Sequence, residues 1–243
     1  MKIISFSLYG TNLKYINGMF RNLEIGNTLL PEWKSLIYCG ESVSDSTKYK
    51  LSDLGAILED TPGIEDASAM FWRFQIPKDP NLQRIIFRDA DSRISAREKF
   101  AVEEWESSGE TIHIMRDHVS HNSPILGGMW GLKKDGFNYL KEQIENYQPR
   151  GEYGEDQKFL SQTVYKMFLD KSMIHDSIFW REKHRRNFPM RSIDGAFVGE
   201  SFAFDDKPDH ISRDKLLTIE NSGWKKNLAA LKDYLDLLLG RFR

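Results

Sequence analysis

The sequence has 243 residues, with 34 Lys and Arg residues against 36 Asp and Glu residues, which gives a formal net charge of −2. This balance offers no electrostatic case for binding nucleic acid, so we expect no nucleic-acid partner. Cys39 is the single cysteine, which excludes an internal disulfide framework, and no apolar run approaches the length of a membrane span. The first residues do not resemble a signal sequence either. We expect one cytoplasmic α/β domain with appended segments.

The first eighty residues predict alternating strands and helices, which is typical of a parallel sheet with a Rossmann-like, nucleotide-binding half. Ser7 and Tyr9 lie at the end of the first predicted strand and are candidates for contact with a base or ribose, although Ser7 could equally be an ordinary residue of a strand face. Arg73, in an aromatic helix, is a candidate phosphate contact or a charged side chain at a rim. The predicted elements are strands at 3–8, 33–39 and 56–58 and helices at 14–29, 44–54 and 67–76.

The most informative stretch is residues 84–93. An apolar strand at 85–87 ends in Asp89 and Asp91, and in open α/β sheets ligands bind at that edge. Two carboxylates there can hold Mg²⁺ or Mn²⁺, and such an ion would bridge them to a diphosphate. Arg88 and Arg93 match phosphate oxygens in geometry. The alternative is that both aspartates only form a turn.

The middle of the chain supplies polar side chains and glycines that could face a sugar. A polar loop containing His118 and His121 follows a predicted strand at 111–115. The next apolar stretch, 125–132, carries several glycines, so we expect a ligand or another backbone to approach Gly128 closely. Trp130 could stack on a sugar or belong to the core.

Glu155 and Asp156 open a predicted helix after another at 136–147. Acids in a first helical turn usually interact with the helix dipole, which leaves one of the pair free for chemistry. A last short strand at 173–177 brings His175 to a sheet edge, as a third metal ligand or as part of a polar turn.

The C-terminal part, 178–243, predicts a loop-rich flap followed by an amphipathic helix. Its basic cluster at 181–186 could clamp a diphosphate, contact anionic lipid or be plain surface. Apolar residues recur at helical spacing from Trp224 to Leu238, which favours docking on the same domain over membrane-surface attachment or dimerisation. Peripheral association with the inner face of a membrane is therefore an alternative.

Together these segments resemble a glycosyltransferase of the GT-A fold. Asp89-Ala90-Asp91 matches the D-x-D motif of that family, residues 127–131 resemble its glycine-rich acceptor-side strand, and Gly154-Glu155-Asp156 resembles its x-E-D motif. Residues 88–93 and 124–131 are also similar to bacterial and large-virus transferases that build surface or capsular polysaccharide. The resemblance implies one domain with a mixed, mostly parallel sheet flanked by helices. Its donor half would be 1–93 and its acceptor half 94–177.

The resemblance also implies the site. Asp89, Asp91 and His175 would hold Mn²⁺ or Mg²⁺ on a nucleoside-diphosphate sugar, with UDP-sugars favoured, and Ser7, Tyr9, Arg73, Arg88 and Arg93 would contact the donor. A saccharide or glycolipid acceptor would meet the following residues: His118, His121, Gly128 and Trp130.

Asp156, with Glu155 beside it, would be the general base of an inverting transfer. Asp-Gln at this place also occurs in retaining relatives similar to glycogenin, but their H-x-x-G-x-x-K signature is absent after His175, which favours inversion. Two other functions stay open. A sugar-phosphate nucleotidyltransferase would need a glycine-rich, lysine-bearing loop after the first strand, which residues 8–12 lack. The other is a non-catalytic carbohydrate-binding module.

Overall fold

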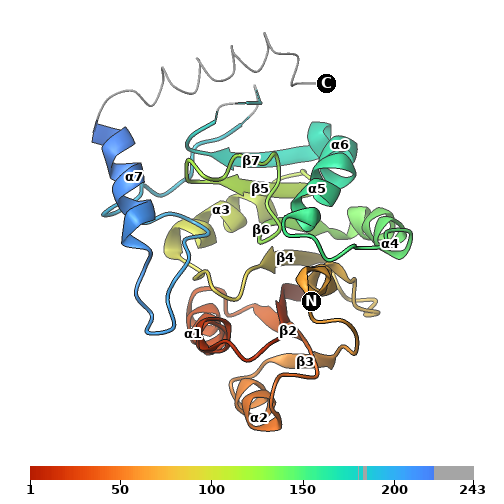
Figure 1. Ribbon diagram of the computed structural model, residues 1–243. Helices are drawn as coiled ribbons and strands as arrows, with labels where there is room; N and C mark the ends of the chain where they lie inside the picture. Colours follow the sequence, from red (N-terminus) through yellow and green to blue (C-terminus); the bar gives the residue numbers. More distant parts are fainter. Residues whose placement is uncertain (180, 183–184, 222–243) are drawn as a thin grey trace.

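A computed structural model describes residues 1–179, 181–182 and 185–221. A seven-stranded sheet runs through it in the order β3-β2-β1-β4-β6-β5-β7 (Figure 1). β6 runs antiparallel to β4 and β5, whereas the other neighbouring pairs are parallel. The strands are β1 (Lys2–Leu8), β2 (Trp33–Cys39), β3 (Ile57–Asp60), β4 (Arg84–Arg88), β5 (Ile112–Arg116), β6 (Met129–Lys133) and β7 (Ser172–Asp176).

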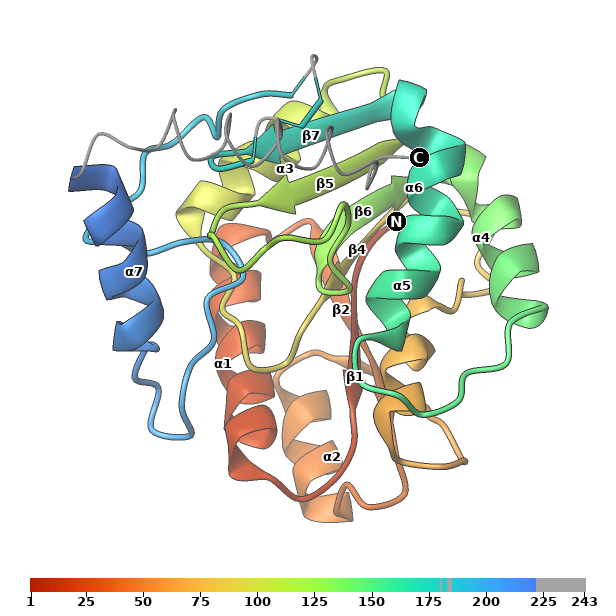
Figure 2. The same cartoon turned by 45° about the horizontal axis from the view of Figure 1, so that its top comes forward.

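Helices cover both faces of the sheet (Figures 1 and 2). On one face lie α1 (Leu13–Leu29) and α3 (Ala96–Glu106), and on the other lie the 3-10 helix η1 (Ala67–Phe74), α4 (Phe137–Glu145) and α5 (Glu155–Gln162). The remaining helical segments are α2 (Asp45–Asp53), η2 (Lys134–Gly136), α6 (Val164–Phe168), η3 (Leu169–Lys171) and α7 (His210–Asn221).

Side chains that alternate along each strand build a separate core on each face. In β4, Ile85 and Phe87 pack with the aromatic residues of η1, α4 and α5, whereas Ile86 packs with α1 and α3. Helix caps fix where the covering helices begin: Asn12 accepts a hydrogen bond from the Lys14 amide at the start of α1.

The predicted α/β class with a mixed, mostly parallel sheet is confirmed. Four details differ. Residues 67–74 form a 3-10 helix, β6 begins only at Met129, the helix from Glu155 breaks at Thr163, and α7 was not predicted. The predicted amphipathic helix beyond 221 lies outside the described residues. Within the described part of the chain, no helix is both long and apolar enough to cross a membrane.

Candidate active site

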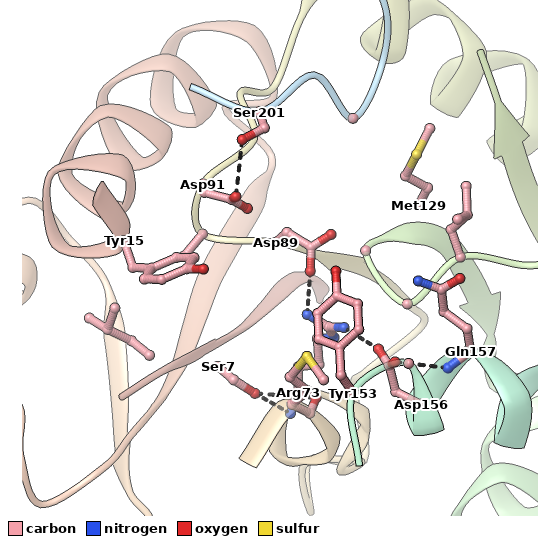
Figure 3. Close-up of a pocket in the computed structure, with 18 of the residues that line it drawn as sticks. Ser7, Tyr15, Arg73, Asp89, Asp91, Met129, Tyr153, Asp156, Gln157 and Ser201 are labelled. Atoms are coloured by element: carbon pink, nitrogen blue, oxygen red, sulfur yellow. Dashed lines mark hydrogen bonds and ion pairs between the residues drawn. The ribbon is translucent and has the colours of Figure 1, made fainter. Parts of the chain in front are cut away.

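A cavity of about 580 Å³ opens where β1 and β4 end and where β6 and α5 begin (Figure 3). Since parallel strands end at the same sheet edge, residues distant in sequence meet here. The predicted residues that line it are Ser7, Tyr9, Arg73, Asp89, Asp91, His121, Gly128 and Asp156. The structure brings these eight predicted residues together in one cavity, whereas the other candidates lie elsewhere.

Arg73 joins the two acidic parts of the cavity. Its Nη1 donates to Asp89 Oδ1 at 2.6 Å and its Nη2 donates to Asp156 Oδ2 at 2.8 Å. Burial lowers the pKa of Arg73, but the two carboxylates outweigh it and the pKa is raised. Arg73 is thus a buried, charged bridge between the end of β4 and the start of α5.

Two serine side chains of β1 hold the backbone of Arg73, which belongs to η1. Ser7 Oγ accepts a hydrogen bond from the Arg73 amide at 3.0 Å, and Ser5 Oγ donates to the Arg73 carbonyl at 2.6 Å. Tyr9 packs edge-on against Trp72 with ring centroids 5.7 Å apart. Ser7 therefore positions Arg73 as well as lining the cavity.

Asp91 has partners of its own. Lys14 Nζ lies 2.6 Å from Asp91 Oδ2, and Ser201 Oγ donates to the same oxygen at 3.2 Å. The Phe202 amide donates to the Asp91 carbonyl at 2.9 Å. The segment before α7 thereby lies across the D-x-D turn, as Figure 3 shows for Ser201.

Two glycines let the chain entering β6 approach the acids. A Cβ at Gly127 would clash with Asp156 Oδ2 and the Arg73 guanidinium, and a Cβ at Gly128 would clash with the Asp89 carboxylate. The close approach expected at Gly128 is therefore the approach of this segment to the carboxylates of Asp89 and Asp156. Only its backbone fits there.

His121 lines the cavity as a neutral imidazole. Burial lowers the pKa of His121 to about 3, with smaller contributions from His118 and nearby arginines. Its Nδ1 accepts hydrogen bonds from the amides of Asp117 and His118, at 3.0 and 3.1 Å. The proton of the neutral ring is consequently on Nε2, which has no partner among the described residues and is free to donate.

Asp89 and Asp91 are the residues that could hold a divalent ion. Asp89 Oδ2 and Asp91 Oδ1 have no protein partner among the described residues, so each aspartate offers one hard oxygen. No group of three or more His, Cys, Asp and Glu side chains that could hold a metal occurs in the described parts of the chain. Two carboxylates fit an ion that completes its coordination with phosphate oxygens and water.

Arg88 and Arg93 do not line the cavity, so their prediction as donor contacts is wrong. Arg88 follows Ile86 on the α3 face of β4, where its guanidinium is buried against Glu98 at 3.0 Å. Arg93 donates to Asp206 at 2.8 Å and lines a separate cavity of about 320 Å³. Both guanidiniums are thus turned away from the two aspartates that they flank in sequence.

His175 is not part of the acidic cluster, so its prediction as the third metal ligand is wrong. β7 pairs with β5, which leaves β5 and β6 between His175 and β4. Both ring nitrogens are engaged, Nδ1 with His113 at 2.8 Å and Nε2 with Glu104 at 3.2 Å. His175 therefore belongs to a buried polar contact between strands and α3.

Two predicted acceptor contacts also lie elsewhere. Trp130 is fully buried and stacks on Phe87, its partner in β4, with centroids 4.2 Å apart, so the core alternative holds. His118 stacks on Phe197, and its ring nitrogens contact Ser120 Oγ at 2.6 Å and the Ser212 carbonyl at 2.9 Å. Neither side chain lines the cavity.

Glu155 has a structural role, which corrects its prediction as a catalytic group. Its carboxylate accepts hydrogen bonds from the Tyr147 hydroxyl and the Arg150 amide, both at 2.8 Å. Partial burial raises the pKa of Glu155, but these hydrogen bonds outweigh it and the pKa is lowered. Of the x-E-D pair, Asp156 alone lines the cavity.

Sequence reasoning missed several residues that line the cavity or contact its acids. Tyr153 and Gln157 lie close in sequence to the predicted Asp156, which was a usable signal. Ser201 had none, because the segment that carries it has no periodic pattern. Among the missed residues are Lys14, Tyr15, Met70, Tyr153, Gln157 and Ser201.

Comparison with solved structures identifies the fold. A glycosyltransferase involved in glycosylation of the major capsid of PBCV-1 aligns with a TM-score of 0.50 and 16% identity, over 72% of this chain and 81% of that one. The chain has a GT-A fold. The expected fold is therefore confirmed, while identity at this level carries no statement about activity.

Two further solved structures align with lower scores. They are a mannosyltransferase of Pyrobaculum calidifontis in complex with GDP-Man and Mn²⁺ (TM-score 0.48, 12% identity, 79% of this chain and 57% of that one) and 4-diphosphocytidyl-2C-methyl-D-erythritol synthase of Anaerococcus prevotii (0.46, 10%, 78% and 92%). A comparison with curated proteins gives no match.

A family model described as the L1 transposable element dsRBD-like domain matches residues 129–185. In the structure, β6 and β7 from this segment both pair with β5, which lies outside it. The matched residues therefore do not form a separate folding unit but part of the seven-stranded sheet.

Proposed function

We propose that this protein is a glycosyltransferase that moves a sugar from a nucleoside-diphosphate sugar to a saccharide or glycolipid acceptor, in surface polysaccharide synthesis. The observation that carries the proposal is the convergence of Asp89, Asp91 and Asp156 with Arg73 in one cavity at the ligand-binding edge of a GT-A sheet. The first donors to test are UDP-sugars.

The charge of the cavity supports dependence on Mn²⁺ or Mg²⁺. Three aspartates line it, and the cations in contact with them are Arg73 and Lys14, so acids outnumber bases where an anionic diphosphate would bind. Because Arg88 and Arg93 do not line the cavity, a dication held by Asp89 and Asp91 would offset the excess negative charge. When bound, the ion would neutralise charge on the departing diphosphate.

We propose that the Asp156 carboxylate is the general base that takes the proton of the acceptor hydroxyl. In an inverting transfer the acceptor oxygen bonds to the anomeric carbon, the bond from that carbon to the diphosphate breaks, and the hydroxyl proton goes to the carboxylate. The ion pair of Oδ2 with Arg73 and the hydrogen bond that Oδ1 accepts from the Gln157 amide at 2.8 Å fix the orientation of the Asp156 carboxylate. Arg73 would thereby couple the donor end of the cavity to the acceptor end.

The test is a screen of UDP-, GDP- and dTDP-sugars for slow hydrolysis with Mn²⁺ or Mg²⁺, which requires no acceptor. We expect Asp89→Asn to abolish metal-dependent hydrolysis, while Asp53→Asn, at an exposed position of α2, leaves it unchanged. Absence of turnover and of calorimetric binding with every donor would contradict the proposal and favour a non-catalytic carbohydrate-binding module. Release of pyrophosphate from nucleoside triphosphate and sugar phosphate would indicate a nucleotidyltransferase.

Cytoplasmic location and peripheral membrane association through the C-terminal region are further proposals. The segment that would mediate the association includes residues outside the described part of the chain, so the support for it is the apolar spacing in the sequence alone. Co-sedimentation of the full chain with anionic and neutral vesicles tests it.

A further inference from the structure

The loop that leads into α5 presents an aromatic ring at the cavity. Tyr153 lines the cavity and is 94% exposed, which makes it the most exposed of the large hydrophobic residues in the described part of the chain. Its ring forms no hydrogen bond or ring contact with another described residue, and Figure 3 shows it in front of Arg73 and beside Asp156. An unpartnered ring at a cavity calls for an explanation, since aromatic side chains contribute most when they are covered.

The loop holds a defined shape. Gly151 and Gly154 have φ angles of +78° and +79°, a conformation that glycine adopts without strain, and a Cβ at Gly151 would clash with Asp66. Glu155 accepts hydrogen bonds from the loop amides of Arg150 at 2.8 Å and Glu152 at 3.4 Å. The backbone is therefore fixed on both sides of Tyr153, so the ring is exposed on an ordered loop.

Polar groups without partners among the described residues also line the cavity. His121 offers its Nε2–H, and the side-chain amide of Gln157 has no hydrogen bond among the described residues although it lines the cavity. Asp156 lies next to Gln157 in α5 and contacts Arg73. An apolar ring face together with a few unpaired donors and acceptors is the composition of a small-molecule site.

We propose that Tyr153 is the stacking platform for the pyranose ring of a saccharide acceptor, and that it determines acceptor affinity. A pyranose has a face of C–H groups that packs on an aromatic ring, and its edge carries hydroxyls for which His121 and Gln157 are unpaired partners in the same cavity. This assignment rests on the proposed function. Ser7 and Tyr9, at the end of β1, mark the donor end, and Tyr153 belongs instead to the loop that carries Asp156.

The experiment measures saccharide binding and donor hydrolysis separately in the full chain. Saturation-transfer NMR with UDP and diamagnetic Mg²⁺ present uses methyl α- and β-glucoside, galactoside and mannoside, cellobiose and lactose as probes. Tyr153→Ala should weaken the tightest-binding probe by about tenfold, and Tyr153→Phe by less than about twofold because the ring remains. The control is Tyr49→Ala on α2, a tyrosine that is 76% exposed and does not line the cavity, and it should change nothing.

Each outcome decides a different claim. If no probe binds the wild-type chain, or if Tyr153→Ala binds as tightly as wild type, the platform is refuted even where metal-dependent donor hydrolysis persists. If the probes bind through Tyr153 but no donor is hydrolysed, the platform stands and the transferase proposal fails. Thermal melting of Tyr153→Ala should stay within about 1 °C of wild type, because the residue is 94% exposed and little packing is lost.

Discussion

The cavity and the buried ends of β5 and β7 contain the same kinds of charged residue, but these residues differ in exposure and in how fully they are paired. At the ends of β5 and β7, Arg116 is enclosed by Asp176 at 2.9 Å and by Glu182, and none of the three side chains is more than 6% exposed. In the cavity, Asp89 is 43% exposed and has one free carboxylate oxygen. Residue type does not separate the two regions. The two regions differ in that the cavity has carboxylate oxygens without hydrogen-bond partners among the described residues next to open space, which is typical of a ligand-binding site.

The largest expected effect is a loss of stability when the buried ion pairs of Arg116 are removed. Arg116→Met should lower the free energy of unfolding by about 3–5 kcal/mol, because it leaves two buried carboxylates uncompensated. The matched control is Arg186→Met, since Arg186 is 57% exposed and its ion pair with Glu104 should contribute under ~1 kcal/mol. Urea denaturation checks both variants, and equal losses would contradict the distinction.

The same substitution in both regions should have opposite readouts. Asp91→Asn should lower metal-dependent turnover by about 10²–10³-fold with little change in the free energy of unfolding, since Asp91 faces the cavity. Asp117→Asn should cost about 2–3 kcal/mol of stability, because this buried carboxylate binds Arg97 at 2.6 Å and the Val198 amide at 2.9 Å. Turnover per folded molecule measured together with denaturation separates them. Loss of stability in Asp91→Asn, with turnover intact, would reverse the comparison.

A pH titration of stability tests the neutral state of His121. Its folded-state pKa of about 3 lies below the ordinary histidine value of 6.5, so the unfolded chain binds the proton first as pH falls. This contribution to stability is therefore full above pH 6.5 and decreases as the pH drops towards 3, reaching a loss of about 2 kcal/mol at pH 5. His121→Asn, whose Oδ1 can accept the same two amides, should remove that part of the slope between pH 7 and pH 5 in urea denaturation. An unchanged slope would show that another group titrates.

The smallest effect is expected at His175. His175→Asn should leave the Mn²⁺ concentration for half-maximal turnover within about twofold of wild type, because two strands separate this residue from β4. Measuring turnover against Mn²⁺ concentration checks this. A tenfold rise in the required Mn²⁺ would place His175 at the metal and remove the boundary between the two regions.

Periodicity in the sequence was enough to predict an α/β fold, most of the strands and the position of Asp89 and Asp91 after one of them, whereas the mixed sheet was implied by the resemblance to the GT-A family. The two-residue alternation of β4 also contained the answer for Arg88, which shares the face of Ile86 and pairs with Glu98 three residues after the cap at Ser95. That signal was present but not used.

Strand order explains the other errors. Nothing in the sequence shows that β7 pairs with β5 or that β6 is inserted antiparallel between β4 and β5. His175 is therefore separated from the acids, and Trp130 packs in the core against its β4 partner Phe87. Contacts such as that of Ser201 with Asp91, 110 residues apart, depend on where an irregular segment crosses the sheet edge, which no local pattern encodes.

Gly127 and Gly128 limit how this protein can be re-engineered. Glycine is already the smallest residue, and a Cβ at either position would clash with a carboxylate or with the Arg73 guanidinium. A variant library intended to admit bulkier molecules gains no room on that side. Room can be gained instead at lining residues that have side chains to shorten, such as Met70 and Tyr15.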